Sequence, residues 1–188
     1  IQKKLVRAML AQKNAAGAIA ILKKAPRWAD GQALLAEAQF ETGEPGEAIQ
    51  AAEQGLTLDP ANEACRVQLS RIRLAQGNVD ASFAAIFPAV DAAVAVKDFG
   101  RAAVYVAPIL EAAPAHRGAL TKMAEVREAE GKSVEASALL RVAAREAERD
   151  ADLEAAVEQY RHVLRLCPGD AEAGARLREL APAPAAPG

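Results

Sequence analysis

Apolar residues recur at helical spacing through residues 29–62, and the pattern divides this stretch into two helices. The apolar face of the first helix is made by Leu34, Leu35, Ala36 and Ala38, and that of the second by Ala48, Ile49, Ala52 and Leu56. Thr42–Pro45 ends the first helix and Leu58–Pro60 ends the second. A helical hairpin of this size cannot bury its apolar stripe alone, so the pattern predicts stacked neighbours on both sides.

The same residues that mark helix ends and turns recur along the chain at regular spacing. A small residue recurs in the second helix of each hairpin with spacings of 30, 34, 20, 34 and 20, at Ala18, Ala48, Ser82, Ala102, Ala136 and Ala156. Prolines that close helices keep the register: Pro26 and Pro60 are 34 residues apart, and Pro60, Pro114 and Pro168 follow at steps of 54. Turn signals lie at Gly43, Gly77, Gly131, Lys97–Phe99 and Asp150–Leu153. Three concordant series indicate internal repeats.

At these positions the chain resembles the tetratricopeptide repeat family. The residues that carry the resemblance are Leu35, Ala36, Phe40, Gly43, Ala48, Leu56, Asp59, Pro60, Leu69, Gly77, Ser82 and Ala89. The resemblance implies an all-α, right-handed α-solenoid of about eleven antiparallel helices. The chain departs from the family pattern where Gln32 and Arg66 replace an early aromatic residue, and where each 20-residue step lacks about one helix.

The repeats predict a single helical domain over residues 1–180, beginning with a shortened hairpin at 1–27. Residues 79–96 contain no glycine and are predicted to form one long helix kinked at Pro88. Residues 133–149 are predicted to form a second long helix with Ser133 as its N-cap, the alternative being two very short helices. Residues 181–188 have the composition of a Pro/Ala linker or disordered tail, and we expect the natural protein to continue on at least one side.

Composition supports helices packed through small side chains, because 52% of residues are hydrophobic and 4% are aromatic. A net charge of -2 argues against nucleic acid or an anionic membrane as the general partner. No apolar run approaches the roughly 18 residues that span a bilayer. Cys65 and Cys167 are predicted to be buried, inert thiols. The compartment stays open, with the cytoplasm slightly favoured over the periplasm.

Three features invite a chemical role, but two are better explained by repeat turns and the third, a pair of histidines, lacks neighbours for catalysis or metal binding. Glu130–Ser133 lacks the first glycine and the preceding strand of a phosphate loop. Asp150–Glu154 lacks the glycine and the later glutamate of a calcium loop. His116 and His162 lie 46 residues apart on different helices, away from cysteines and paired carboxylates. We therefore predict no catalytic site, no cofactor and no metal.

The charges are segregated at the N-terminal end. Residues 1–27 contain seven basic residues and no acid, and residues 28–64 contain eight acids and no base. One interpretation is a basic patch that steers an acidic partner, beside an acidic patch that excludes the wrong one. The other is a pair of solvated faces on adjacent hairpins that attract each other weakly.

In the tetratricopeptide repeat family, partner peptides commonly lie in a groove lined by the first helix of each hairpin. The resemblance maps the groove residues to Lys3, Arg7, Leu10, Glu37, Phe40, Val67, Arg71 and Leu74. Phe40 and Leu74 are either apolar anchors for a peptide or ordinary inter-helix packing. The carboxylate clamp of some family members needs lysine and asparagine on these faces, where this chain offers Ala33, Glu37 and Gln68.

These observations predict a non-enzymatic scaffold that binds a protein or peptide partner in this groove. Alanine- and arginine-rich usage suggests a bacterial source, where family resemblance implies a place in a multiprotein assembly. The alternatives are a self-assembling structural solenoid, with weak self-association, and a regulatory module of a larger protein.

Overall fold

The computed structural model describes residues 2–24 and 28–180, and these residues form eleven α-helices and no strand. The helices are α1 (Gln2–Ala11), α2 (Ala15–Lys24), α3 (Ala29–Glu41), α4 (Pro45–Leu58), α5 (Glu63–Ala75), α6 (Val79–Ala95), α7 (Phe99–Ala112), α8 (Arg117–Ala129), α9 (Ser133–Arg149), α10 (Leu153–Leu166) and α11 (Ala171–Leu180). The predicted all-α class is confirmed. The chain divides into two compact units, Ile1–Ala89 and Val90–Gly188, with the boundary inside α6.

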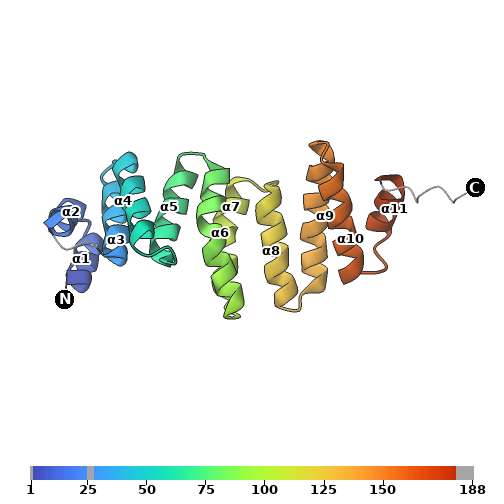
Figure 1. The fold of residues 1–188 in the computed structure, drawn as a ribbon, viewed down its shortest axis with the longest axis horizontal. Helices are drawn as coiled ribbons and strands as arrows, with labels where there is room; N and C mark the ends of the chain where they lie inside the picture. Colours follow the sequence, from blue (N-terminus) through green and yellow to red (C-terminus); the bar gives the residue numbers. More distant parts are fainter. Residues whose placement is uncertain (1, 25–27, 181–188) are drawn as a thin grey trace, which may run out of the picture. The chain divides into compact units, whose positions relative to one another are not determined.

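In the first unit, consecutive helices pack against one another from α1 to α5 (Figure 1). The helix α3 is central, because it contacts α2 and α4 along the chain and also α1 and α5. Two hydrophobic clusters hold it in place. Leu34 and Ala38 pack into a cluster with α1 and α2, and Ala36 packs into a cluster with α4 and α5. Trp28, just before α3, packs against the first of these clusters, which agrees with its position between hairpins.

In the second unit, α9 packs against both α8 and α10, which lie beside it in Figure 1. The helix α9 thus acts as the second helix of one hairpin and the first helix of the next. It runs unbroken for 17 residues, as α6 does across Pro88, so the prediction of two single long helices is confirmed. The alternative of short paired helices is wrong, because 134–149 contains no glycine or proline that would interrupt the backbone.

One turn geometry is repeated six times among the described residues. A residue with positive φ follows the end of a helix at Lys13, Gly43, Gly77, Lys97, Gly131 and Ala151, with φ between 59° and 82°. These positions repeat the 30, 34, 20, 34 and 20 spacing of the small residues. The left-handed conformation reverses the chain at a helix end, and glycine adopts it without steric cost.

The small residue that follows each turn by five positions is fully buried. Ala18, Ala48, Ser82, Ala102, Ala136 and Ala156 all have 0% relative exposure. A small side chain at a crossing lets two helix backbones approach closely while larger neighbours fill the flanks. The repeat register predicted from sequence is therefore also the register of the core.

Seven of the described helices, α2, α5, α6, α7, α8, α10 and α11, are capped at the N-terminus by a side chain just outside the helix, whereas α3 and α4 have no side-chain cap bond. Asn14, Asn62, Asn78, Asp98, His116, Asp152 and Asp170 each accept a hydrogen bond from the backbone N–H three residues later. Ser133 is not among them, and its predicted role is wrong. Lys132 holds the N-cap position of α9 without a side-chain cap bond, and Ser133 is already helical.

Neither cysteine forms a disulfide: Cys65 is buried, as predicted, whereas Cys167 is half-buried, which corrects the prediction that both thiols are buried. Burial raises the pKa of the Cys65 thiol to about 11, which keeps it protonated and unreactive. Pro26 and the predicted tail at 181–188 lie outside the described residues.

Candidate interaction groove

A cavity of about 190 Å³ lies where α1, α3 and α5 meet. It is lined by Lys3, Arg7, Asp30, Ala33, Leu34, Glu37, Ala64, Val67 and Gln68. Four of the eight predicted groove residues, Lys3, Arg7, Glu37 and Val67, come together here. They come from the first helices of three successive hairpins, which are the helices that the resemblance assigned to the groove.

The carboxylate of Asp30 is held by two hydrogen bonds at this cavity. The Lys3 Nζ donates to Asp30 Oδ2 at 2.5 Å, and Asn62 Nδ2 donates to Asp30 Oδ1 at 3.0 Å. The hydrogen bond from Lys3, followed by that from Asn62, lowers the pKa of Asp30, and the charge of Arg7 adds to the effect. Asp30 is therefore ionised at neutral pH, and it ties α1, α3 and the start of α5 together.

Asp30 and Asn62 were not among the groove residues predicted from the sequence. Asp30 lies seven residues before Glu37, two turns along the same face of α3, and that spacing was the available signal. Asn62 caps α5 and also reaches Asp30, and no local pattern indicates the second contact.

Phe40 and Arg71 lie together further along α3 and α5. The Arg71 guanidinium carbon is 5.4 Å from the centroid of the Phe40 ring, a cation–π distance. Phe40 is half-buried and packs against the cluster of α4 and α5 that contains Ala48 and Ile72. One part of the ring thus belongs to the core, while the stacked guanidinium gives the pair an exposed, charged outer surface.

The remaining two predicted residues lie away from the cavity. Leu10 is 9% exposed and packs in the core cluster with Val6 and Leu34. Leu74 is half-buried near the end of α5.

The charge blocks face each other across the cavity. Lys3 and Arg7 from the basic block stand on α1, and Asp30 and Glu37 from the acidic block stand on α3. Lys3 and Asp30 are 46% and 39% exposed, so solvent screens their ion pair and its contribution to stability is small. Among the described residues no partner for the Arg7 guanidinium is recorded.

The motifs that suggested other chemistry have structural positions. Glu130–Ser133 is the turn between α8 and α9, where Glu130 accepts from Arg127 and Lys132. In 150–154, Asp150 and Asp152 pair with Arg117, and Asp152 caps α10. No group of acids, histidines and cysteines that could hold a metal is found in the part of the chain that the structure describes.

The two histidines also have partners. His116 Nδ1 accepts from the backbone N–H of Ala119 and so caps α8. His162 Nε2 lies 2.8 Å from Glu128 Oε2.

In the described ranges, no helix is both long and apolar enough to cross a bilayer.

Residues 29–62 match the family model of the tetratricopeptide repeat. The matched segment is similar to a tetratricopeptide repeat. It consists of α3, α4 and the turn at Gly43. This is the hairpin whose helix ends, at Thr42–Pro45 and Leu58–Pro60, were predicted from the sequence. The predicted family resemblance is confirmed at this segment, and the groove described above is built around its first helix.

Comparison with other proteins adds fold likeness alone. No curated protein sequence matches the chain. The chain is similar to the structure of PilF from Pseudomonas aeruginosa, with 19% identity, 95% of this chain and 96% of that chain covered, and a TM-score of 0.45. It is similar to MamA with 19% identity, 79% and 73% covered and a TM-score of 0.42. It is also similar to a thermophilic TPR protein of Thermus thermophilus, with 16% identity, 94% and 95% covered and a TM-score of 0.34. Similarity at this level says nothing about what this chain binds.

Proposed function

We propose that this chain is a protein-interaction module whose groove on α1, α3 and α5 binds a partner peptide. The observation that carries the proposal is the cavity that brings Lys3, Arg7, Glu37 and Val67 together from three separate helices. Its walls combine both charge signs with the apolar side chains of Leu34 and Val67. A groove with a small apolar centre and a charged rim is the kind of surface that binds an extended or amphipathic peptide.

Arg7 is the side chain to which we assign recognition of an acidic group on the peptide. Lys3 is committed to Asp30, whereas the Arg7 guanidinium faces the same cavity and is exposed. Guanidinium groups bind carboxylates through two parallel hydrogen bonds, which gives them both affinity and direction. The Phe40–Arg71 pair would extend the contact along α3 and α5.

The test is selection of peptides from a displayed library on the wild-type chain, followed by anisotropy titrations of a selected peptide. Arg7→Glu combined with Phe40→Ala is expected to weaken binding by at least about tenfold, which corresponds to roughly 1.4 kcal/mol. Lys4→Glu is the matched control, because Lys4 is exposed on the same helix and does not line the cavity. Equal losses in the two variants would mean that general charge, rather than this groove, holds the peptide.

A further inference from the structure

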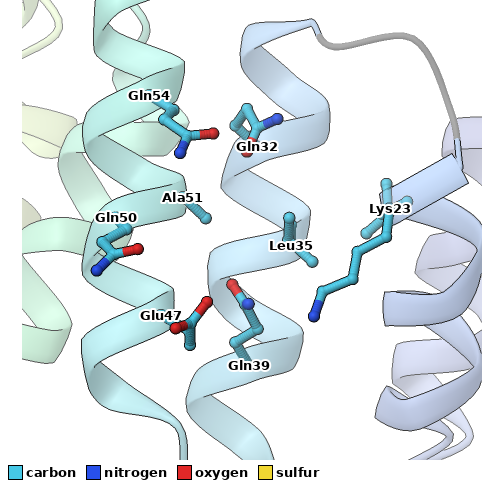
Figure 2. Close-up of a pocket in the computed structure, with 9 residues that line it drawn as sticks. Lys23, Gln32, Leu35, Gln39, Glu47, Gln50, Ala51 and Gln54 are labelled. Carbon is cyan, nitrogen blue, oxygen red and sulfur yellow. The ribbon is translucent and has the colours of Figure 1, made fainter.

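A second cavity, of about 370 Å³, lies between α2, α3 and α4. On α3 it is lined by Gln32, Leu35 and Gln39, and on α4 by Glu47, Ala51 and Gln54 (Figure 2). Lys23 reaches in from α2 (Figure 2). The volume is within the range of small ligand sites.

This cavity and the interaction groove lie on opposite sides of α3. The groove takes Asp30, Ala33 and Glu37 from α3, and the second cavity takes Gln32, Leu35 and Gln39. The second set is offset from the first by two residues, which is roughly 200° around a helix of 3.6 residues per turn. Both sets repeat over two turns, so α3 presents two separate lined surfaces.

Gln32 and Gln39 are unusual for a helix core. They are 6% and 2% exposed, yet among the described residues the Oε1 atoms of both side chains have no hydrogen-bond partner. Buried polar atoms in folded proteins are nearly always paired, and a buried amide without a partner is a candidate for a functional contact. Both amides line the cavity, so a ligand there can supply the missing donors.

The acceptors point to a cation that carries several N–H groups. At one end of the cavity Glu47 faces Gln39, so a carboxylate and a buried amide oxygen converge on the same space (Figure 2). Both residues belong to the block 28–64, which contains eight acids and no base. The Lys23 ammonium stands on the opposite side, on a flexible and exposed stem. A guanidinium offers five donors in one plane and no acceptor, which matches this arrangement.

We propose that the cavity between α2, α3 and α4 is a second binding site that takes an arginine side chain of a partner polypeptide. The guanidinium lies between Gln39 and Glu47, and the methylene stem lies along Leu35 and Ala51. Arginine packs its stem on apolar surface while its head stays hydrogen-bonded, so the apolar floor and polar end fit one side chain. This site does not depend on the groove on α1, α3 and α5.

The experiment uses N-acetyl-L-arginine methylamide as the probe and follows the side-chain amide signals of Gln32 and Gln39 by NMR in the isotope-labelled full chain. N-acetyl-L-citrulline methylamide is the neutral isostere, and N-acetyl-L-lysine methylamide is the cation without a planar fork. The arginine probe is expected to shift both amide signals in a saturable manner, and the other two to bind at least about fivefold more weakly. Equal binding of the three probes, or no shift with arginine, would overturn the proposal.

Variants separate the named contacts from folding and from general charge. Gln39→Leu and Glu47→Gln are each expected to weaken the arginine probe by about fivefold. Glu41→Gln is the matched control, because Glu41 is an exposed acid at the end of α3 that does not line the cavity. If Glu41→Gln weakened binding as much as Glu47→Gln, the site assignment would be wrong, and Glu47 gives this answer even if Gln39→Leu perturbs folding.

Removing the charge of Lys23 gives a further test of the proposed site, because the direction of the change in affinity is predicted. Lys23→Met is expected to strengthen binding of the arginine probe, because it removes a like charge from the lining of the same cavity. Weaker binding of the arginine probe after this change would overturn the proposal. Arg7→Glu is expected to leave probe binding unchanged, so failure of this site and failure of the groove give different results.

Discussion

The Lys3 ammonium lies 2.5 Å from the Asp30 carboxylate, and this contact joins the basic block at 1–27 to the acidic block at 28–64. The two residues are 27 positions apart and belong to different hairpins. The attraction between oppositely charged blocks is thus realised as a specific ion pair in the wall of the groove, with Asn62 as a third member.

The first prediction concerns acid. Because Lys3 and Asn62 lower the pKa of Asp30 in the folded state, the unfolded chain takes up the proton first as the pH falls. The stabilisation is present above the ordinary Asp pKa of about 3.9 and is lost as the pH falls through the lower folded value. Urea unfolding at neutral pH and at about pH 3 should show a smaller acid-induced loss in Lys3→Met than in wild type. Lys4→Met serves as control, and equal losses in Lys3→Met and wild type would contradict the assignment.

The second prediction concerns the buried small residues. Ala102 is fully buried near the start of α7, so Ala102→Leu should overpack the crossing and lower the free energy of unfolding by about 1–3 kcal/mol. Val104→Leu on the same helix is the control, because Val104 is 67% exposed. Thermal unfolding followed by circular dichroism measures both. An unchanged midpoint for Ala102→Leu would count against the repeat register.

The third prediction compares two glycines of α4. A Cβ at Gly55 would overlap Cys65 Sγ and lie 3.0 Å from Gln32 Cβ, whereas a Cβ at Gly46 would meet nothing within 4 Å. Gly55→Ala should therefore destabilise the chain although alanine favours helices, and Gly46→Ala should stabilise it by up to about 1 kcal/mol. Chemical denaturation gives both values. Stabilisation by both changes would show that α4 and α5 approach less closely than described.

The fourth prediction concerns the repeated turn. Ala151 has a φ of 59°, a conformation in which a Cβ is crowded, and the equivalent turn between α8 and α9 uses Gly131 with a φ of 82°. Ala151→Gly should raise the free energy of unfolding by about 0.5–1 kcal/mol, and Gly131→Ala should lower it. Urea midpoints of the two variants test the equivalence. A loss of stability in Ala151→Gly would be the contrary result.

The fifth prediction concerns alkaline pH and the second unit. The Tyr160 ring is fully buried and its hydroxyl donates to Glu148 Oε1 at 2.7 Å, while Arg176 binds the same carboxylate. Burial, followed by the bond to Glu148, raises the pKa of Tyr160 to about 12. The folded chain therefore keeps this proton when the unfolded chain loses it, and stability falls as the pH rises above about 10.

Tyr160→Phe removes both the bond and this proton. The variant should lose about 0.5–1.5 kcal/mol at neutral pH and show a shallower decline in stability between about pH 9 and 11. Urea unfolding across that range measures the slope. A decline identical to that of wild type would indicate that Tyr160 is not the titrating group.

Helices, turns and repeat register could be predicted from the sequence because they depend on residues close together in the chain. Helical spacing of apolar residues and the turn at each repeat are local properties, and close packing at a crossing requires a small residue at a set distance from the turn. The six positive-φ residues and the six fully buried small residues confirm this register. Ser133 shows the limit of prediction from local sequence, because α9 begins at Ser133 and its N-cap is Lys132, one residue earlier than predicted.

The make-up of the two cavities was decided by the tertiary structure. Lys3, Arg7, Glu37 and Val67 were predicted as groove residues, but the bond from Lys3 to Asp30 depends on how α1 packs against α3. The burial of Gln32 and Gln39 had no local signal, because glutamine is usually exposed and its exposure here is set by α2 and α4 on either side of α3. The sequence by itself therefore determined the helical repeat and its periodicity, through short-range sterics and spacing. Only packing between helices distant in the chain decided which polar side chains of α3 lie beside which charges.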